Sequence, residues 1–237
     1  MSGKALRRLL LPSFDLLLLQ RRRLLRLVEP GGSVLDAGCG NGTMALALAR
    51  RGCRVVAASN DPVEVERLQT LATPGLEVRL HDLARDGPAA GAFDAAICFD
   101  VLEHICDDRA ALRAVAHSLR PGGRLLLTVP NRECPPLWGD TVSPSEDGGH
   151  VRPGYTRSEV ATLLAEAGLA AIRWGSFGGL LTRKAMGVAR RLERRPGRAW
   201  LLLRFLWLVL MRPLCHLDSL LPGASYELFV VAERRNP

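Results

Sequence analysis

Short apolar runs alternate with segments of helical length along most of this 237-residue chain. Apolar runs bounded by turn residues predict buried strands. The first such strand ends at residues 34–35, and others span 54–58, 76–80, 92–99, 124–129 and 227–233. Helices are predicted at 43–50, from residue 62, at 108–119 and from residue 157. This alternation predicts an α/β fold, a mostly parallel sheet with helices on both faces.

Local end signals support these boundaries. Asp61 before Pro62 is typical of a helix N-cap followed by the first helical position. Thr156 and Glu159 form a capping-box pattern. Residues 120–123 (RPGG) predict a turn into the strand at 124–129. The Pro- and Gly-rich stretch 132–153, which contains Trp138, Asp140 and His150, is long enough to predict a functional loop or lid.

Two leucine-rich regions lie outside this alternation. Residues 3–29 predict helices divided at Pro12. Residues 199–211 are apolar on all sides except at Arg204, which predicts a buried helix. Both regions are flanked by basic residues. They predict an apolar cap that either roofs a hydrophobic substrate or touches a bilayer.

The net charge of +8 is concentrated in two clusters, near residues 7–26 and 183–198. Basic runs beside leucine-rich runs favour contact with an anionic membrane surface. A basic face exposed to water explains the same pattern equally well. Nucleic acid is the other partner class, but the aromatic content is only 5%, and single-stranded RNA is usually bound by stacking on aromatic side chains.

The six cysteines form no C-x-x-C pair, which argues against a zinc ribbon or a disulfide framework. Buried thiols in a reducing, cytoplasmic compartment are expected instead. Pro12, Asp15 and the arginines that follow do not fit a signal peptide, and no apolar stretch is long enough to predict a membrane-spanning helix.

The stretch D-A-G-C-G-N-G (residues 36–42) joins the first strand to its helix. Glycine allows the positive φ of a tight turn and lets a ligand lie against bare backbone. The helix N-terminus offers unpaired N–H groups to an anionic ligand group, and Asp36 can reach a polar ligand edge. A glycine-rich turn alone is typical of several nucleotide-binding families.

This stretch resembles the first motif of the class I S-adenosylmethionine (SAM) methyltransferases. F-D at 93–94, L-E-H at 102–104 and L-R-P-G-G at 119–123 resemble later motifs of that family, in order. The motif pattern is nearest to the ubiquinone-biosynthesis O-methyltransferases. The resemblance covers roughly residues 27–169 and implies a Rossmann-like seven-stranded sheet whose last strand is antiparallel. It divides the chain into an N-terminal helical segment (1–29), a SAM-binding core (30–177), a helical insertion (178–222) and a closing strand and tail (223–237).

The resemblance also implies the cofactor contacts. An acidic residue usually ends the second strand in this family and binds the ribose hydroxyls, but here Ser59 stands at that place and Asp61 follows. Asp82, beside Leu83, matches the residue that accepts from the adenine amino group. The full predicted set for SAM is Asp36, Gly38, Cys39, Gly40, Gly42, Ser59, Asn60, Asp61, Asp82, Leu83 and Phe99.

Asp100, Glu103 and His104 are spaced i, i+3, i+4, which places them on one face if the segment is helical. With His150 they predict a site for Mg, Mn or Zn that activates a hydroxyl. The ubiquinone-biosynthesis group has E-x-x-E-H here and a later His in a loop. Without metal, His150 or His104 is the predicted general base, ahead of Tyr155 and Asp140.

These features predict a SAM-dependent methyltransferase acting on a hydroxyl oxygen of a hydrophobic or lipid-linked small molecule. Methylation of RNA 2′-hydroxyls is an alternative that the positive charge favours. A second alternative is a protein that binds SAM without catalysis and serves a partner. Only Ser59, in place of the usual acidic residue, favours it. The acceptor, the oligomeric state and the choice between oxygen, carbon and nitrogen are left open by the sequence.

Overall fold

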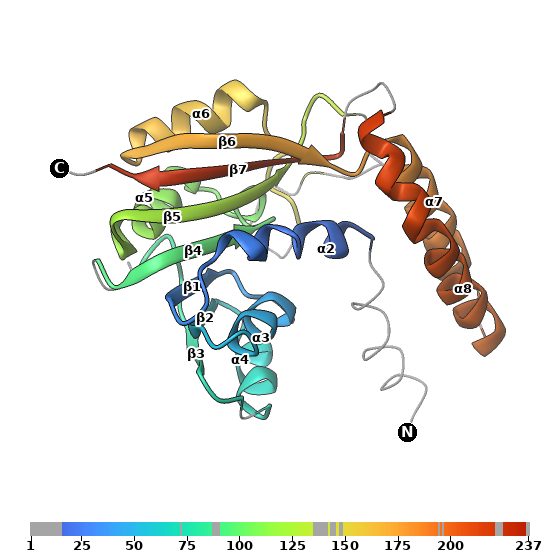
Figure 1. Cartoon of the computed structure of the whole chain (residues 1–237), viewed down its shortest axis with the longest axis horizontal. Helices are drawn as coiled ribbons and strands as arrows, with labels where there is room; N and C mark the ends of the chain where they lie inside the picture. The colour runs from blue at the N-terminus through green and yellow to red at the C-terminus, as the bar shows by residue number, and fades with distance from the viewer. Residues whose placement is uncertain are drawn as a thin grey trace.

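The computed structural model describes residues 16–71, 73–86, 91–134, 142, 146, 149–193, 195, 197–220 and 225–235. Its centre is a seven-stranded sheet in the order β3-β2-β1-β4-β5-β7-β6 (Figure 1). The strands are β1 (Ser33–Ala37), β2 (Arg54–Ser59), β3 (Leu76–Leu80), β4 (Phe93–Phe99), β5 (Leu119–Pro130), β6 (Leu169–Phe177) and β7 (Glu227–Arg234). Only β7 runs antiparallel to its neighbours β5 and β6. The predicted mostly parallel sheet with an antiparallel last strand is therefore confirmed.

Helices follow the strands. They are α3 (Thr43–Ala49), α4 (Pro62–Gln69), α5 (Asp108–Ser118) and α6 (Arg157–Glu166). The last three begin at polar side-chain caps, whereas α3 begins at Gly42. The Asp61 carboxylate accepts from the Val63 backbone N–H at 2.8 Å, which confirms the predicted N-cap. Thr156 and Glu159 form the predicted capping box. The Asp107 carboxylate caps α5 by accepting from the Ala110 backbone N–H.

The central strands are buried on both faces: adjacent residues point in opposite directions, and helices cover each side. Leu35 of β1 packs with Leu112 and Leu163, on the side of α5 and α6. Its neighbour Val34 packs with Met44 and Leu48, on the side of α3 and the 3₁₀ helix η2 (Leu24–Leu27). Parallel strands that are covered on both faces have nearly continuous apolar sequences. The positions of these central strands could therefore be predicted from the sequence.

Two strand predictions differ from the structure. Residues 120–123, predicted as a turn, are part of β5, which begins at Leu119 and shifts register against β4 between Phe93 and Ala95. Phe93 pairs with Leu119 and Ala95 pairs with Arg124, so residues 120–123 form an irregular stretch between paired positions, with Gly122 at a φ of +75°. No strand was located at 169–177 from the hydrophobic pattern, and β6 forms there at the sheet edge with only one residue buried.

The remaining helices gather at the carboxyl-end side of the sheet. They are α2 (Leu16–Arg21), α7 (Leu180–Glu193), α8 (Arg198–Leu214) and the 3₁₀ helix η4 (Cys215–Leu220). A separate apolar cluster holds them together, formed by Leu16, Ala185, Ala189, Leu208 and Cys215. Figure 1 shows the α7–α8 hairpin extending away from the sheet. The predicted helices before residue 16 lie outside the described residues.

The prediction that residues 199–211 form a buried helix is wrong. Only one face of α8 is buried, and Arg204 lies on that face. The opposite face exposes Leu202, Leu203, Leu206, Val209, Leu210 and Leu214, each between 43% and 63% accessible. A hairpin that packs against the body through one helix face leaves the other face without cover.

All six cysteines are free thiols, and five of them are buried, as predicted. Within the described ranges, no helix combines the length and the apolar character that crossing a membrane requires.

Candidate functional site

A cavity of about 600 Å³ opens at the carboxyl ends of β1, β2, β3 and β4. Ligands of parallel α/β sheets bind at this edge. Seven of the eleven residues predicted to hold the cofactor line the cavity: Gly38, Gly40, Ser59, Asn60, Asp61, Asp82 and Leu83. Four do not line it: Asp36, Cys39, Gly42 and Phe99.

The glycine-rich turn forms one wall of this cavity. Gly38 and Gly40 have φ values of +80° and +49°. A Cβ on Gly38 would lie 2.4 Å from Val101 Cγ2, whereas a Cβ on Gly40 would meet nothing closer than 3.9 Å. The backbone at Gly40 is therefore open to a ligand. Gly42 serves packing instead, because a Cβ there would lie 2.2 Å from Leu68 Cδ2 of α4.

Asp36 lies at the end of β1 and is 4% accessible. Its Oδ2 has no hydrogen-bond partner within the described part of the chain. Burial raises the pKa of this carboxyl group to about 7. A buried acceptor without a partner is costly unless a ligand group donates to it. This unpaired oxygen fits a cofactor that brings a cationic or N–H donor to the turn.

At the end of β2 the structure adds an acidic residue that the sequence analysis missed. The Ser59 hydroxyl donates to Glu64 Oε2 at 2.8 Å, and both residues line the cavity. Asp61 also lines it while capping α4. Glu64 stands in the first turn of α4, and this turn brings its carboxylate back beside Ser59. The sequence does contain an indication of this residue, because Glu64 is an acidic residue within one helical turn of the end of β2.

The end of β3 contributes Asp82 and Leu83. Asp82 Oδ1 accepts from the Ala84 N–H at 2.9 Å, so this carboxylate also caps the turn that follows β3. His81 lines the cavity as well, and its buried Nε2 lacks a partner among the described residues. Phe99, by contrast, packs with the core beside α3.

Asp100 follows β4 with a φ of +53°, a left-handed value that no other described non-glycine residue adopts. Such backbone strain often occurs at functional sites. Its Oδ1 accepts from the Thr128 hydroxyl at 2.9 Å, and its Oδ2 pairs with Arg21 of α2. Arg21 also binds the buried Glu227, whose pKa is raised to about 8, mainly by burial. Arg21 and Glu227 were not predicted, because their proximity depends on tertiary packing.

Three of the four predicted metal ligands come together. One donor atom each from Glu103, His104 and His150 lies within 4.8 Å of the others. Asp100 is not part of this group. The predicted shared helical face does not form, because only Leu102–His104 make a 3₁₀ turn (η3) and Asp100 precedes it with left-handed backbone.

The donor chemistry of this group fits a divalent cation. Glu103 is fully buried, and neither of its carboxylate oxygens has a hydrogen-bond partner among the described residues. His104 Nδ1 lies 2.9 Å from the Gly149 carbonyl oxygen. A carbonyl only accepts, so Nδ1 carries the proton of this hydrogen bond. In the neutral ring Nε2 then keeps its lone pair, the tautomer found in metal-ligating histidines.

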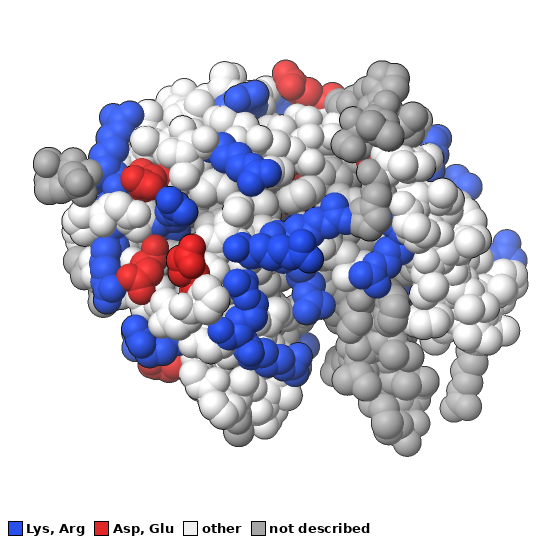
Figure 2. Space-filling view, in the orientation of Figure 1, with Lys and Arg blue, Asp and Glu red and all other residues white. Residues whose placement is uncertain are grey.

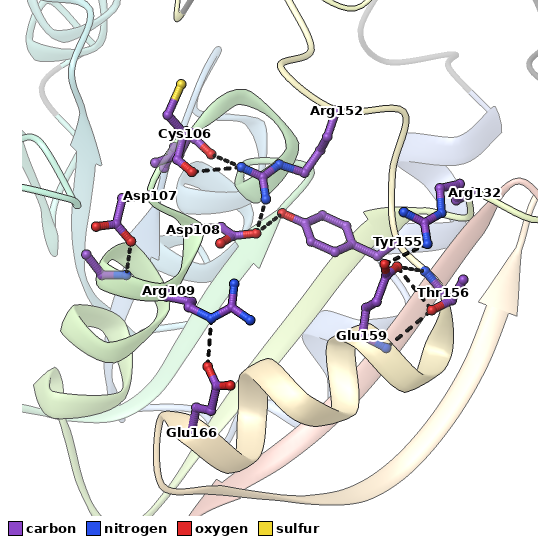
Figure 3. Close-up of polar contacts among 12 residues, drawn as sticks. Cys106, Asp107, Asp108, Arg109, Arg132, Arg152, Tyr155, Thr156, Glu159 and Glu166 are labelled. Carbon is purple, nitrogen blue, oxygen red and sulfur yellow. Dashed lines mark hydrogen bonds and ion pairs between the residues drawn. The ribbon is translucent and has the colours of Figure 1, made fainter.

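The chain around His150 is held against α5. The Val151 N–H donates to the Glu103 carbonyl at 2.8 Å. Arg152 pairs with Asp108 and donates to the carbonyl oxygens of Ile105 and Cys106 (Figure 3). The Tyr155 hydroxyl donates to Asp108 at 2.8 Å, and burial raises the Tyr155 pKa far above its usual value, which makes Tyr155 a poor base. These contacts place His150 beside His104, with ring centroids 4.7 Å apart. Trp138 and Asp140 lie outside the described residues.

Comparisons with known proteins give a consistent result. A family profile described as a methyltransferase domain matches residues 14–173. The ubiquinone biosynthesis O-methyltransferase of Xanthomonas campestris pv. campestris (strain B100) is 42% identical over 113 residues, which cover 45% of this chain and 46% of that relative. The match thus spans about half the length of that curated relative.

Two solved structures share the fold at low identity. A SAM-dependent methyltransferase from Mesorhizobium loti aligns with a TM-score of 0.61 and 19% identity, over 90% of this chain and 96% of its own. The Burkholderia thailandensis 1,6-didemethyltoxoflavin-N1-methyltransferase was solved with 1,6-didemethyltoxoflavin and S-adenosylhomocysteine. It aligns with a TM-score of 0.55 and 20% identity, over 92% of this chain and 77% of its own.

Proposed function

This chain belongs to the methyltransferase-domain family, and we propose that it transfers a methyl group from SAM to a hydroxyl oxygen of a hydrophobic or lipid-linked small molecule. One observation carries the proposal. His104 lines the cavity at the carboxyl ends of the strands and also belongs to the Glu103–His104–His150 group. Groups able to activate a hydroxyl therefore adjoin the place where the cofactor binds.

The cofactor residues divide by role. The open backbone at Gly40 and the unpaired Asp36 oxygen receive the polar, amino-acid end of SAM. Ser59 and Glu64 offer hydrogen-bonding groups to the ribose hydroxyls, in the place of the usual strand-end acid. Asp82 and Leu83 offer a carboxylate edge and an apolar face to the adenine. Bound SAM supplies a methyl group made electrophilic by its sulfonium.

Glu103, His104 and His150 would hold a divalent cation, whose chemistry is to lower the pKa of a hydroxyl bound to it. His104 is the residue that would take the hydroxyl proton if no cation takes part, because its Nε2 keeps a lone pair when Nδ1 donates to Gly149. Arg152, Asp108 and Tyr155 hold the neighbouring chain and so orient His150.

The acceptor class rests on the apolar surface beside the site. The exposed leucines of α8 belong to the helical group that includes α2, and Arg21 of α2 reaches Asp100 at the cavity. An amphiphilic acceptor can use such a surface while its hydroxyl reaches the cavity. The same surface supports the proposal that the protein works at a membrane surface.

The proposal is tested by methyl transfer from radiolabelled SAM to phenols and catechols with and without an apolar tail. Wild type should bind SAM in calorimetry and methylate tailed acceptors preferentially. Gly38→Ala should weaken SAM binding at least about tenfold, because its Cβ would displace Val101. Gly52→Ala, a matched control with φ +83° and open space around the Cβ, bears only the backbone strain and should keep wild-type affinity.

A second arm of the assay addresses the cation. After treatment with EDTA, readdition of Mg, Mn or Zn should restore transfer in wild type but not in Glu103→Gln. Transfer that is indifferent to EDTA would remove the cation from the proposal and leave His104 as base. SAM binding without transfer to any acceptor would instead favour a non-catalytic SAM-binding protein.

A further inference from the structure

A second cavity, of about 720 Å³, lies beside α2. It is bounded by α2, η2, α3 and the end of α8, and none of its lining residues also lines the cofactor cavity. No group of the proposed reaction is therefore assigned to it.

The charge of this cavity has one sign. Six arginines line it, and none of its described lining residues is acidic. They are Arg22, Arg23, Arg26, Arg50, Arg51 and Arg212. Figure 2 shows Lys and Arg side chains gathered at the centre of this face, with the Asp and Glu side chains of the same view lying apart. Converging arginines repel one another, so the site favours an anionic ligand. Guanidinium groups bind phosphate oxygens through paired N–H donors.

The arginines come from elements far apart in the chain, and one of them is fixed in place. Arg51 donates to the backbone carbonyl oxygens of Leu25 and Val28, which ties the end of α3 to η2. Arg26, Arg50 and Arg212 have no ion-pair partner in the part of the chain that the structure describes, and each lies on a different segment. Their charges remain available to a ligand.

Apolar groups lie beside this charge. Leu16, Leu19, Leu25 and Ala47 also line the cavity. Arg212 follows Val209 by three residues on α8, so it borders the exposed apolar face of that helix, where Leu206 and Leu210 are 52% and 63% accessible. The ligand that suits both surfaces is an amphiphile with an anionic head. An RNA strand would leave the leucine face unused.

We propose that this cavity binds the phosphate headgroup of an anionic phospholipid while the apolar face of α8 contacts the acyl chains. The inference rests on the membrane-surface part of the proposed function and adds a specific headgroup site to it. The fold brings three arginines of the first basic cluster together with two at the end of α3 and with Arg212 of α8.

The test is sedimentation of the full chain with vesicles. Wild type should bind vesicles of phosphatidylglycerol and phosphatidylcholine in equal parts, and should bind pure phosphatidylcholine vesicles much more weakly. Arg26→Gln/Arg50→Gln should lose about tenfold or more of its affinity for the phosphatidylglycerol vesicles, since each basic residue near an anionic surface contributes roughly fivefold. Leu206→Ser/Leu210→Ser should weaken binding as well. SAM affinity measured on each variant shows that it remains folded.

Matched controls carry the same changes elsewhere. Arg113→Gln/Arg173→Gln removes two exposed charges outside the cavity, and Ile172→Ser removes an exposed apolar side chain of β6. Both should bind nearly as wild type does. Equal losses in the two arginine pairs would overturn the headgroup site and leave a diffuse charge effect.

Two further outcomes also contradict the inference. Displacement from vesicles by pyrophosphate at matched phosphate concentration and constant ionic strength would identify a site for a soluble phosphate compound. Wild type that binds no vesicle at all would overturn the membrane-surface part of the proposed function together with the inference. Methyl transfer to a soluble acceptor is measured separately, so failure of the enzyme proposal remains distinguishable.

Discussion

At the scale of single residues, Asp36 shows how a residue proposed to bind a cofactor opposes stability. Its carboxyl group is nearly inaccessible, and one of its oxygens lacks a partner among the described residues. Burial raises its pKa to about 7, against about 3.9 for an exposed aspartate. The group is useful to a cofactor that donates to it and costly in the protein alone.

This cost has a defined pH dependence. Between about pH 4 and pH 7 the native state keeps a proton that the unfolded chain has released, so stability falls as pH rises through this window. Asp36→Asn has no such ionisation. We expect the variant to gain about 3 kcal/mol relative to wild type from pH 4.5 to pH 8 in urea unfolding, and to bind SAM more weakly. A constant difference across this range would contradict the assignment.

At the scale of elements, the segment around His150 depends on one buried ion pair. The side chains of Arg152 and Asp108 are 26% and 6% accessible. The pair between Arg109 and Glu166 lies nearby, but its side chains are 54% and 41% accessible and exposed to solvent (Figure 3). The first pair joins the His150 segment to α5, and the second joins α5 to α6. The first pair is largely buried, whereas the second is exposed.

We therefore expect different costs from the same substitution. Arg152→Met leaves Asp108 buried without its cation and should destabilise the protein by about 3 kcal/mol. Arg109→Met should cost less than about 1 kcal/mol. Urea unfolding compares the two. Arg152→Met should also lower methyl transfer more than SAM affinity, because His150 loses its support. Equal stability losses would show that burial does not decide the strength of these pairs.

At the scale of the whole molecule, the sheet and the α7–α8 hairpin are stabilised unequally. Large clusters cover both faces of the sheet, whereas the buried cluster that holds the hairpin contains five residues. Regions with few buried apolar contacts open locally at lower free energy than the core.

Native-state hydrogen exchange should reveal this difference. The amides of β1, β4 and β5 should exchange only through global unfolding, and those of α7 and α8 should exchange faster. Binding to phosphatidylglycerol vesicles should slow exchange in the hairpin and in η2 while leaving β5 unchanged. Hairpin amides protected as long as those of β5 would contradict the unequal stabilisation.

Particular residues show how far prediction from sequence reached. Asp61, Pro62, Thr156 and Glu159 predicted helix starts correctly because a cap is formed by neighbours in the chain. The hydrophobic pattern missed β6 because an exposed edge strand buries only one of its residues. It also assigned residues 120–123 to a turn before the strand, whereas the structure includes them in β5 as an irregular stretch between the paired residues Leu119 and Arg124.

The sequence by itself determined the parallel core, the glycine-rich turn and the family, because these depend on local periodicity and on residues close together in the chain. Only the tertiary structure decided that Arg21 meets Asp100 from 79 positions away, that Glu64 joins Ser59 at the cavity, and that one face of α8 stays exposed. Each of these depends on which surfaces the packed elements present to one another. A pattern of apolar residues shows that a helix has leucines on every side, but not which of those sides the rest of the molecule covers.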